Sequence, residues 1–106
     1  YNYVAHLAQQ WNVNNNIGIV VGATHPQIMG MIRASVPDMW ILAPGVGTQG
    51  GELESALKSG LRKDGKGLLI PISRSISRAA AGPAKAAAEF RDQIVNIKRE
   101  LNREAR

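Results

Sequence analysis

Pro44-Gly-Val-Gly-Thr-Gln-Gly-Gly51 and Leu68-Leu-Ile-Pro-Ile-Ser-Arg-Ser-Ile76 are the two stretches that decide how this chain folds. An apolar run leads into each: Met39–Ala43 precedes the first stretch, and Leu68–Ile72 opens the second. One run ends in glycines, and the other ends in serines beside an arginine. Backbone N–H groups and a guanidinium at strand ends suit a phosphate group. Two such ends in consecutive βα units predict the phosphate corner of a (β/α)8 barrel, which forms after strands 7 and 8.

Helical and strand patterns alternate along the whole chain. The expected helices and strands, in order, are 1–11, 17–21, 24–35, 39–43, 52–61, 67–72 and 84 to beyond 101. Continuous apolar runs such as Ile17–Val21 are typical of parallel strands that are buried on both faces. The alternation predicts an α/β fold with a parallel sheet, either a barrel or a doubly wound layer.

Three local patterns give finer expectations. Thr24 and Gln27 fit a capping box, which predicts that Thr24 caps the second helix. The side chains expected to face inward from that helix are Ile28, Met31, Ile32 and Ala34. The helical spacing of the last apolar stripe predicts packing on a sheet rather than on a membrane; its members are Phe90, Ile94, Ile97 and Leu101.

The chain has 106 residues, whereas a complete barrel needs roughly 200 or more. We therefore expect residues 1–106 to be one C-terminal segment of a barrel domain, carrying strands 6–8 and incomplete on its own. The first residues read as the later turns of a helix without an initiator Met, which favours truncation. No signal peptide is recognisable, and no apolar run approaches the roughly 18 residues of a membrane span. Cysteine is absent, so disulfides and thiolate chemistry are excluded.

The net charge of +5 is unevenly spread, because residues 58–85 hold seven basic side chains against Asp64 alone. Such a block can be a solvated surface, a positive field for a small anionic ligand, or a nucleic-acid surface. Aromatic residues are not interleaved with the basic ones, so no stacking platform for bases is expected. We therefore expect neither nucleic acid nor a membrane as a partner.

The glycine loop contains Gly45-Val-Gly-Thr-Gln-Gly50, a literal match to the dinucleotide-binding fingerprint. That interpretation needs an acidic residue about 20 positions on, at the next strand end, where Pro71-Ile-Ser-Arg74 stands instead. The glycines are better used to let the backbone approach a ligand and form an anion site at a helix N-terminus. Gln49 is the side chain there that can hydrogen-bond a heterocycle or a phosphate; the alternative is a plain βα turn.

Arg74 stands at a strand end among serines, and its guanidinium suits bidentate phosphate binding. The alternative is a structural salt bridge. The serines lack the G-x-S-x-G elbow of a nucleophile. His25 is expected near a helix start and His6 on a surface or interface, and no constellation of metal ligands is present in the sequence.

Three stretches resemble the last three βα units of orotidine 5′-phosphate decarboxylases: Val20–Thr24, Ala43–Gly51 and Leu69–Ile76. The resemblance covers roughly residues 15–95. Pro-Gly-Val-Gly-x-Gln-Gly-Gly followed by a strand ending in Arg-Ser/Ala-Ile is a fairly specific combination. It is similar to the branch found in many bacteria and in some fused UMP synthases.

The resemblance implies a cytoplasmic homodimer of (β/α)8 barrels that needs no cofactor or metal and converts orotidine 5′-monophosphate to UMP and CO2. By resemblance, Gln49 would bridge phosphate and pyrimidine. Arg74 would clamp the phosphate, helped by backbone N–H groups near Gly51 and Ser73. Pro44 would line the base pocket, and the 44–51 loop would close over the substrate.

The family's Asp-x-Lys-x-x-Asp array does not occur in this sequence, so we expect no catalytic residue in this segment. The resemblance then requires a complementary N-terminal barrel segment to supply the array. Two alternatives remain: another phosphate-binding barrel enzyme, or a non-catalytic phosphate-binding module. Gln49 argues against a sugar-phosphate enzyme, because such a substrate has no base for the amide to contact.

Overall fold

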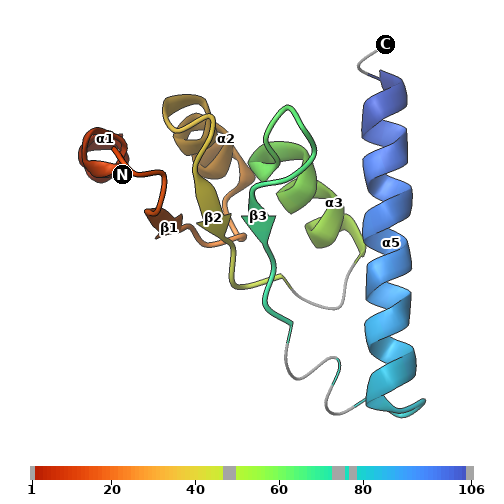
Figure 1. The fold of residues 1–106 in the computed structure, drawn as a ribbon. Helices are drawn as coiled ribbons and strands as arrows, with labels where there is room; N and C mark the ends of the chain where they lie inside the picture. The colour runs from red at the N-terminus through yellow and green to blue at the C-terminus, as the bar shows by residue number, and fades with distance from the viewer. Residues whose placement is uncertain (1, 47–49, 73–75, 77–78, 105–106) are drawn as a thin grey trace.

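The computed structural model describes residues 2–46, 50–72, 76 and 79–104, whose course is drawn in Figure 1. The elements, in chain order, are α1 (Asn2–Trp11), β1 (Gly18–Val20), α2 (Pro26–Ser35), β2 (Trp40–Leu42), α3 (Gly50–Gly60), β3 (Leu68–Leu69) and α5 (Pro83–Glu104). This order confirms the predicted alternation of helices and strands and the α/β class.

The three strands form one parallel sheet in the order β1-β2-β3. Its register aligns Ile19 with Ile41, and Ile41 with Leu68. Pairing continues past the strand ends, because the Ala43 N–H donates to the Leu69 carbonyl at 2.8 Å. All three strands therefore deliver their following loops to the same edge of the sheet.

Helices α1, α2 and α3 lie side by side along one face of the sheet, and α5 stands beyond α3 (Figure 1). The core forms between this helical layer and the sheet. Its largest fully buried side chains are Met29, Val36, Met39, Ile41 and Leu53. The buried volume is thus supplied mainly by α2, α3 and the central strand.

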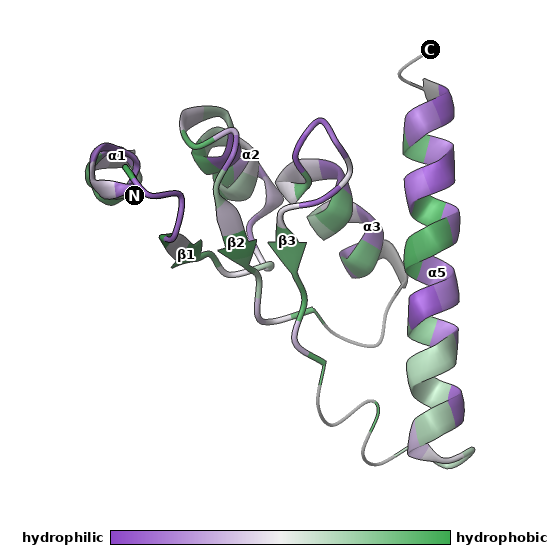
Figure 2. Ribbon diagram, in the orientation of Figure 1, coloured by the Kyte–Doolittle hydropathy of each residue, from purple (hydrophilic) through white to green (hydrophobic). Residues whose placement is uncertain are grey.

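The opposite face of the sheet is apolar and open. Val20 is 67% exposed and Leu69 is 54% exposed, and Trp40 and Leu42 on the central strand are also exposed. Figure 2 shows strongly hydrophobic residues in all three strands. The expectation of strands buried on both faces is wrong for this chain, because the helical layer covers one face only.

Helix α2 begins differently from the prediction. Its N-cap residue is His25, without a side-chain capping bond, and Pro26 occupies the first turn. Proline suits that place because its missing N–H is one that the helix leaves unpaired anyway. The capping box of Thr24 and Gln27 is therefore wrong.

The inward face of α2 also differs from the prediction. Met29, Ile32 and Arg33 are buried, whereas Met31 is 57% exposed and Ala34 is exposed. Ile28 is half-buried against the core. The buried positions form one stripe along the helix, and this stripe includes an arginine. A prediction based on apolar residues alone therefore places the buried face part of a turn away from its true position.

The Arg33 guanidinium donates to four backbone carbonyls. Nε reaches the Gly60 oxygen at 2.7 Å, and Nη2 reaches the Gly67 oxygen at 2.9 Å. Nη1 reaches the oxygens of Val36 at 2.9 Å and Met39 at 2.6 Å. One side chain thus joins the C-terminal ends of α2 and α3 to the segments that enter β2 and β3.

Arg33 is only 8% exposed and has no carboxylate partner among the described residues. Burial lowers its pKa, and the nearby Arg62 charge lowers it further. An arginine side chain nevertheless stays protonated in proteins. Its charge is balanced by carbonyl dipoles, two of which lie at the negative ends of α2 and α3.

The remaining elements follow the prediction closely. Helix α3 starts two residues earlier than expected and buries Leu53, Ala56 and Leu57. Strand β3 is shorter than expected and ends before Pro71, so this proline removes no donor from the described ladder. On α5, the stripe from Phe90 to Leu101 is partly buried against the core. Among the described elements α5 packs mainly beside α3 rather than on the sheet, where the sequence predicted it.

Replacing Arg33 by Met should lower the free energy of unfolding by at least about 3 kcal/mol, because buried carbonyls would lose their donors. Arg33→Lys should also destabilise the fold, since an ammonium cannot present the same planar fork. The measurement is the denaturant midpoint of the full-length protein. Arg91→Met is the matched control: the Arg91–Asp92 pair is exposed, and such pairs contribute less than about 1 kcal/mol. Equal midpoints for the Arg33 and Arg91 variants would contradict the role of Arg33.

Candidate functional site

The candidate site lies at the end of the sheet that is formed by the C-terminal ends of the strands. There the loop after β1 and the loop after β2 are joined directly, because the Ala23 N–H donates to the Pro44 carbonyl at 2.8 Å. The Val21 N–H donates to the Leu42 carbonyl at 2.9 Å just before it. Pro44 is half-buried at this junction. The hydrogen bond to its carbonyl fixes its position at the end of the sheet.

Gly45 follows Pro44 with a φ of 96°, a conformation that side chains other than glycine rarely adopt. A Cβ at this position would lie 3.6 Å from the Thr24 Cγ2 atom. Val46 is buried next to it. The start of the glycine loop is therefore held against the loop after β1 by one hydrogen bond and by close packing.

The far end of the glycine loop enters α3. Gly50 and Gly51 are the first two residues of this helix, and Glu52 lies in its first turn. The first N–H groups of a helix have no partner within it and carry the positive end of its dipole. The buried side chains of Leu53 and Ala56 anchor this end on the core. Gly51 is thus placed where a backbone donor to an anion is expected, while its role stays a prediction.

Three of the predicted site residues lie outside the described residues: Gln49, Ser73 and Arg74. Of the predicted site residues, the structure therefore describes Pro44, at the end of the sheet, and Gly51, in the first turn of α3. Beyond β3, the described chain runs through Pro71 to a half-buried Ile72. The contacts of the other three side chains stay a prediction.

Both histidines are exposed. His25 stands at the N-cap of α2, near the same sheet edge. His6 lies on α1, where its Nε2 atom is 3.2 Å from the Gln10 amide nitrogen.

Within the described ranges, no three His, Asp or Glu side chains are grouped so that they could hold a metal ion. No described helix is long and apolar enough to cross a bilayer.

The sequence reasoning missed two features that position the site. The first is Arg33. The signal that could have revealed it is its helical spacing from Met29, Ile32 and Val36, which places all four on one face of α2. The second is the hydrogen bond between Ala23 and Pro44, which joins two loops whose residues are about 20 positions apart. A backbone bond of this kind leaves no signature in side-chain patterns.

Comparison with known proteins gives a consistent result. No family model matches the chain. A curated relative from Roseiflexus castenholzii, named orotidine 5′-phosphate decarboxylase, is 44% identical over 101 residues, which cover 89% of this chain and 37% of the relative.

Two solved structures share its fold. The Leishmania donovani OMP decarboxylase matches with a TM-score of 0.84 at 44% identity, over 92% of this chain and 37% of its own length. The Leishmania donovani UMP synthase matches with a TM-score of 0.83 at 47% identity, over 92% of this chain and 22% of its own length. The chain therefore spans well under half of the proteins that it matches. Sequence and fold agree that the chain is similar to part of the orotidine 5′-phosphate decarboxylases.

Proposed function

We propose that this chain is the C-terminal segment of an orotidine 5′-phosphate decarboxylase and supplies its phosphate- and base-binding loops. The complete enzyme would convert orotidine 5′-monophosphate to UMP and CO2 in pyrimidine biosynthesis. The observation that carries the proposal is the glycine loop. It begins at a strand end fixed by the Ala23–Pro44 hydrogen bond and ends at the N-terminus of α3.

In this proposal the three strands are strands 6–8 of a (β/α)8 barrel. Their open face would line the barrel, and the strands of a complementary segment would pair with the edges at β1 and β3. The exposed side chains of Val20, Trp40, Leu42 and Leu69 support this reading, because inward-facing positions of such barrels are filled by bulky apolar residues. A parallel sheet left open in this way would also be prone to edge-to-edge association.

The ligand would be held by residues of two consecutive loops. Arg74 would clamp the phosphate, with backbone N–H groups of Gly51 and Ser73 beside it. Gln49 would reach both the phosphate and the pyrimidine, and Pro44 would line the base pocket. Phosphate-binding energy remote from the reacting carbon can orient the base and hold the loop closed over it.

The chemical step would be the work of the complementary segment, since the carboxylate–lysine array is absent from this sequence. This chain contributes binding and orientation, and its part of the proposal needs no cofactor. By likeness to the family, the complete enzyme would be a cytoplasmic homodimer.

The 106-residue chain alone should show no decarboxylation of orotidine 5′-monophosphate, because it lacks the residues that act on the reacting carbon. Addition of the complementary barrel segment should produce activity. The measurement is UMP formation with each segment separately and with both together. UMP formation by this chain alone would overturn the division of roles.

Replacing Arg74 by Ala in the complete enzyme should lower kcat/KM by roughly 10- to 150-fold, the loss expected from a charge-assisted hydrogen bond of about 1.5–3 kcal/mol. A bidentate clamp that also holds a loop closed would give a larger loss. Steady-state kinetics with Arg91→Ala as the control test this, since Arg91 is exposed and paired with Asp92. Near-normal kinetics in the Arg74 variant would make Arg74 a structural residue.

Replacing Gln49 by Ala should weaken the binding of both UMP and uridine, because the amide is proposed to contact the base. Arg74→Ala should weaken UMP alone, because the guanidinium is proposed to touch only phosphate. Calorimetric titration of both ligands gives the comparison, with the exposed Gln93 changed to Ala as the amide control. Equal losses of uridine affinity in the Gln49 and Arg74 variants would contradict this assignment.

A further inference from the structure

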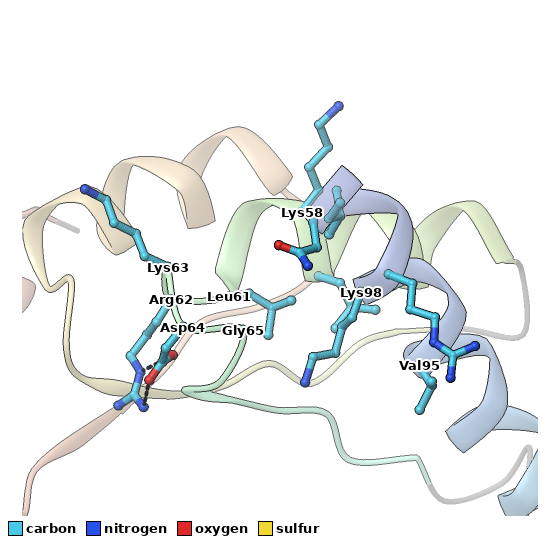
Figure 3. A pocket seen from close by; sticks show the side chains of 12 residues that line it. Lys58, Leu61, Arg62, Lys63, Asp64, Gly65, Val95 and Lys98 are labelled. Atoms are coloured by element: carbon cyan, nitrogen blue, oxygen red, sulfur yellow. Dashed lines mark hydrogen bonds and ion pairs between the residues drawn. The ribbon is translucent and has the colours of Figure 1, made fainter. Parts of the chain in front are cut away.

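The opposite end of the sheet, where the strands begin, carries a cavity that the proposed function does not use. It has a volume of about 550 Å³ and lies between the end of α3, the turn at 61–65 and the C-terminal half of α5. Ligand pockets for small molecules are typically about 300–1,000 Å³. Figure 3 shows it from close by. The cavity is therefore large enough for a nucleotide-sized ligand.

Cationic side chains dominate the lining. Lys58, Lys63, Lys98 and Arg99 contribute to it from three segments, and none of the four has an ion pair among the described residues. Lys58 and Lys63 stand at the rim and project outward (Figure 3). Lys98 lies against Gly65: its Cε and Nζ atoms are 3.5 and 3.9 Å from the place that a Cβ of residue 65 would occupy.

Among the described lining residues, Asp64 is the only carboxylate, and it is already neutralised. Arg62 Nη2 is 2.7 Å from Asp64 Oδ2, and the Lys66 N–H donates to the same carboxylate at 3.0 Å. The hydrogen bond from Arg62 lowers the pKa of Asp64, which keeps the pair charged. Arg62 also lies over the Trp40 ring at 5.3 Å. These contacts fix the turn as a pre-formed wall, which reduces the entropy lost when a ligand binds.

The surplus of positive charge is specific to this cavity. A neighbouring hollow on the other side of the turn shares Arg62, Lys63 and Asp64 with the cavity and adds Asp38, so its two cations face two carboxylates. At the C-terminal end of α3 the Gly60 carbonyl accepts from Arg33, and Lys58 lies in the last turn of the same helix. Lys58, Lys98 and Arg99 have no ion pair among the described residues.

The floor of the cavity is apolar. Leu57 and Leu61 line it from the α3 side, and Val95 and Leu101 line it from α5. Val95 is 41% exposed. A ligand that suits both the rim and the floor needs an anionic group and a flat apolar group within one small molecule.

We propose that this cavity is a second anion site, distinct from the glycine-loop site, which binds a nucleotide-sized phosphate ester. Its phosphates would lie among Lys63, Lys98 and Arg99, and its heterocycle would rest on the Leu61 and Val95 side chains. The site lies at the strand-start end of the sheet, so its ligand and the substrate could be bound together. Inorganic anions would occupy only the charged half.

The test uses the full-length enzyme in the Arg74→Ala background, which disables the proposed catalytic phosphate site. Calorimetry with ATP should detect binding there, and the double change Lys63→Ala and Lys98→Ala should raise the Kd at least tenfold. Lys85→Ala is the matched control, because this exposed lysine lies about 20 Å along α5 from Lys98 at 1.5 Å per residue. Inorganic pyrophosphate should bind at least tenfold more weakly than ATP.

A chemical footprint gives an independent readout. ATP should slow acetylation of Lys98 and Lys63, measured by mass spectrometry, and leave the acetylation rate of Lys85 unchanged. Absence of ATP binding at millimolar concentration, or equal protection of all three lysines, would overturn the proposal. Binding lost in Arg74→Ala but kept in the Lys63 and Lys98 variant would assign it to the catalytic site instead. Equal affinities for ATP and pyrophosphate would overturn the role of the apolar floor.

Discussion

The fold depends on how one buried guanidinium is satisfied. Arg33 donates to four carbonyls that belong to the ends of α2 and α3 and to the entries of β2 and β3. A buried charge without hydrogen bonds would be prohibitively unfavourable, so these four groups must converge wherever Arg33 is buried. The convergence sets the spacing between two helices and two strands at the end of the sheet where the strands begin.

The spacing that Arg33 sets also affects the opposite end of the sheet, where the strands end. Because the strands are parallel and in fixed register, holding their starting ends also fixes where they end and where their loops emerge. The Ala23–Pro44 hydrogen bond then aligns the first two loops, and the buried Leu53 and Ala56 hold the start of α3. The glycine loop thus begins and ends on packed elements, as a site that must orient a ligand requires.

The exposed apolar face of the sheet has a simple physical explanation. Helices cover one side only, so Val20, Trp40, Leu42 and Leu69 keep much of their apolar surface in contact with water. Burying such surface is favourable by about 25 cal/mol per Å². A second segment that completed a barrel would gain this energy, which gives the proposed assembly a driving force independent of the substrate. The cavity beside α5 is linked to that face through Arg62, which lines the cavity and lies over the Trp40 ring.

The sequence by itself determined the α/β class, the order of the elements and the strand ends that carry the glycine loop. These follow from local periodicity and from turn residues such as Gly65, whose φ is 78°. For the proposed site, it identified Pro44 and Gly51 at the two ends of one loop.

Only the tertiary structure decided the phase and the start of α2, the one-sided burial of the sheet and the grouping of cations between α3 and α5. The buried stripe of α2 includes Arg33, whose favourable position depends on carbonyls up to 34 residues away. Continuous apolar runs predicted strands buried on both faces, whereas Trp40 and Leu42 are exposed because the described helices cover only the other face. Lys63 and Lys98 line one cavity because the end of α3 packs beside α5, and long-range packing leaves no local pattern in the sequence.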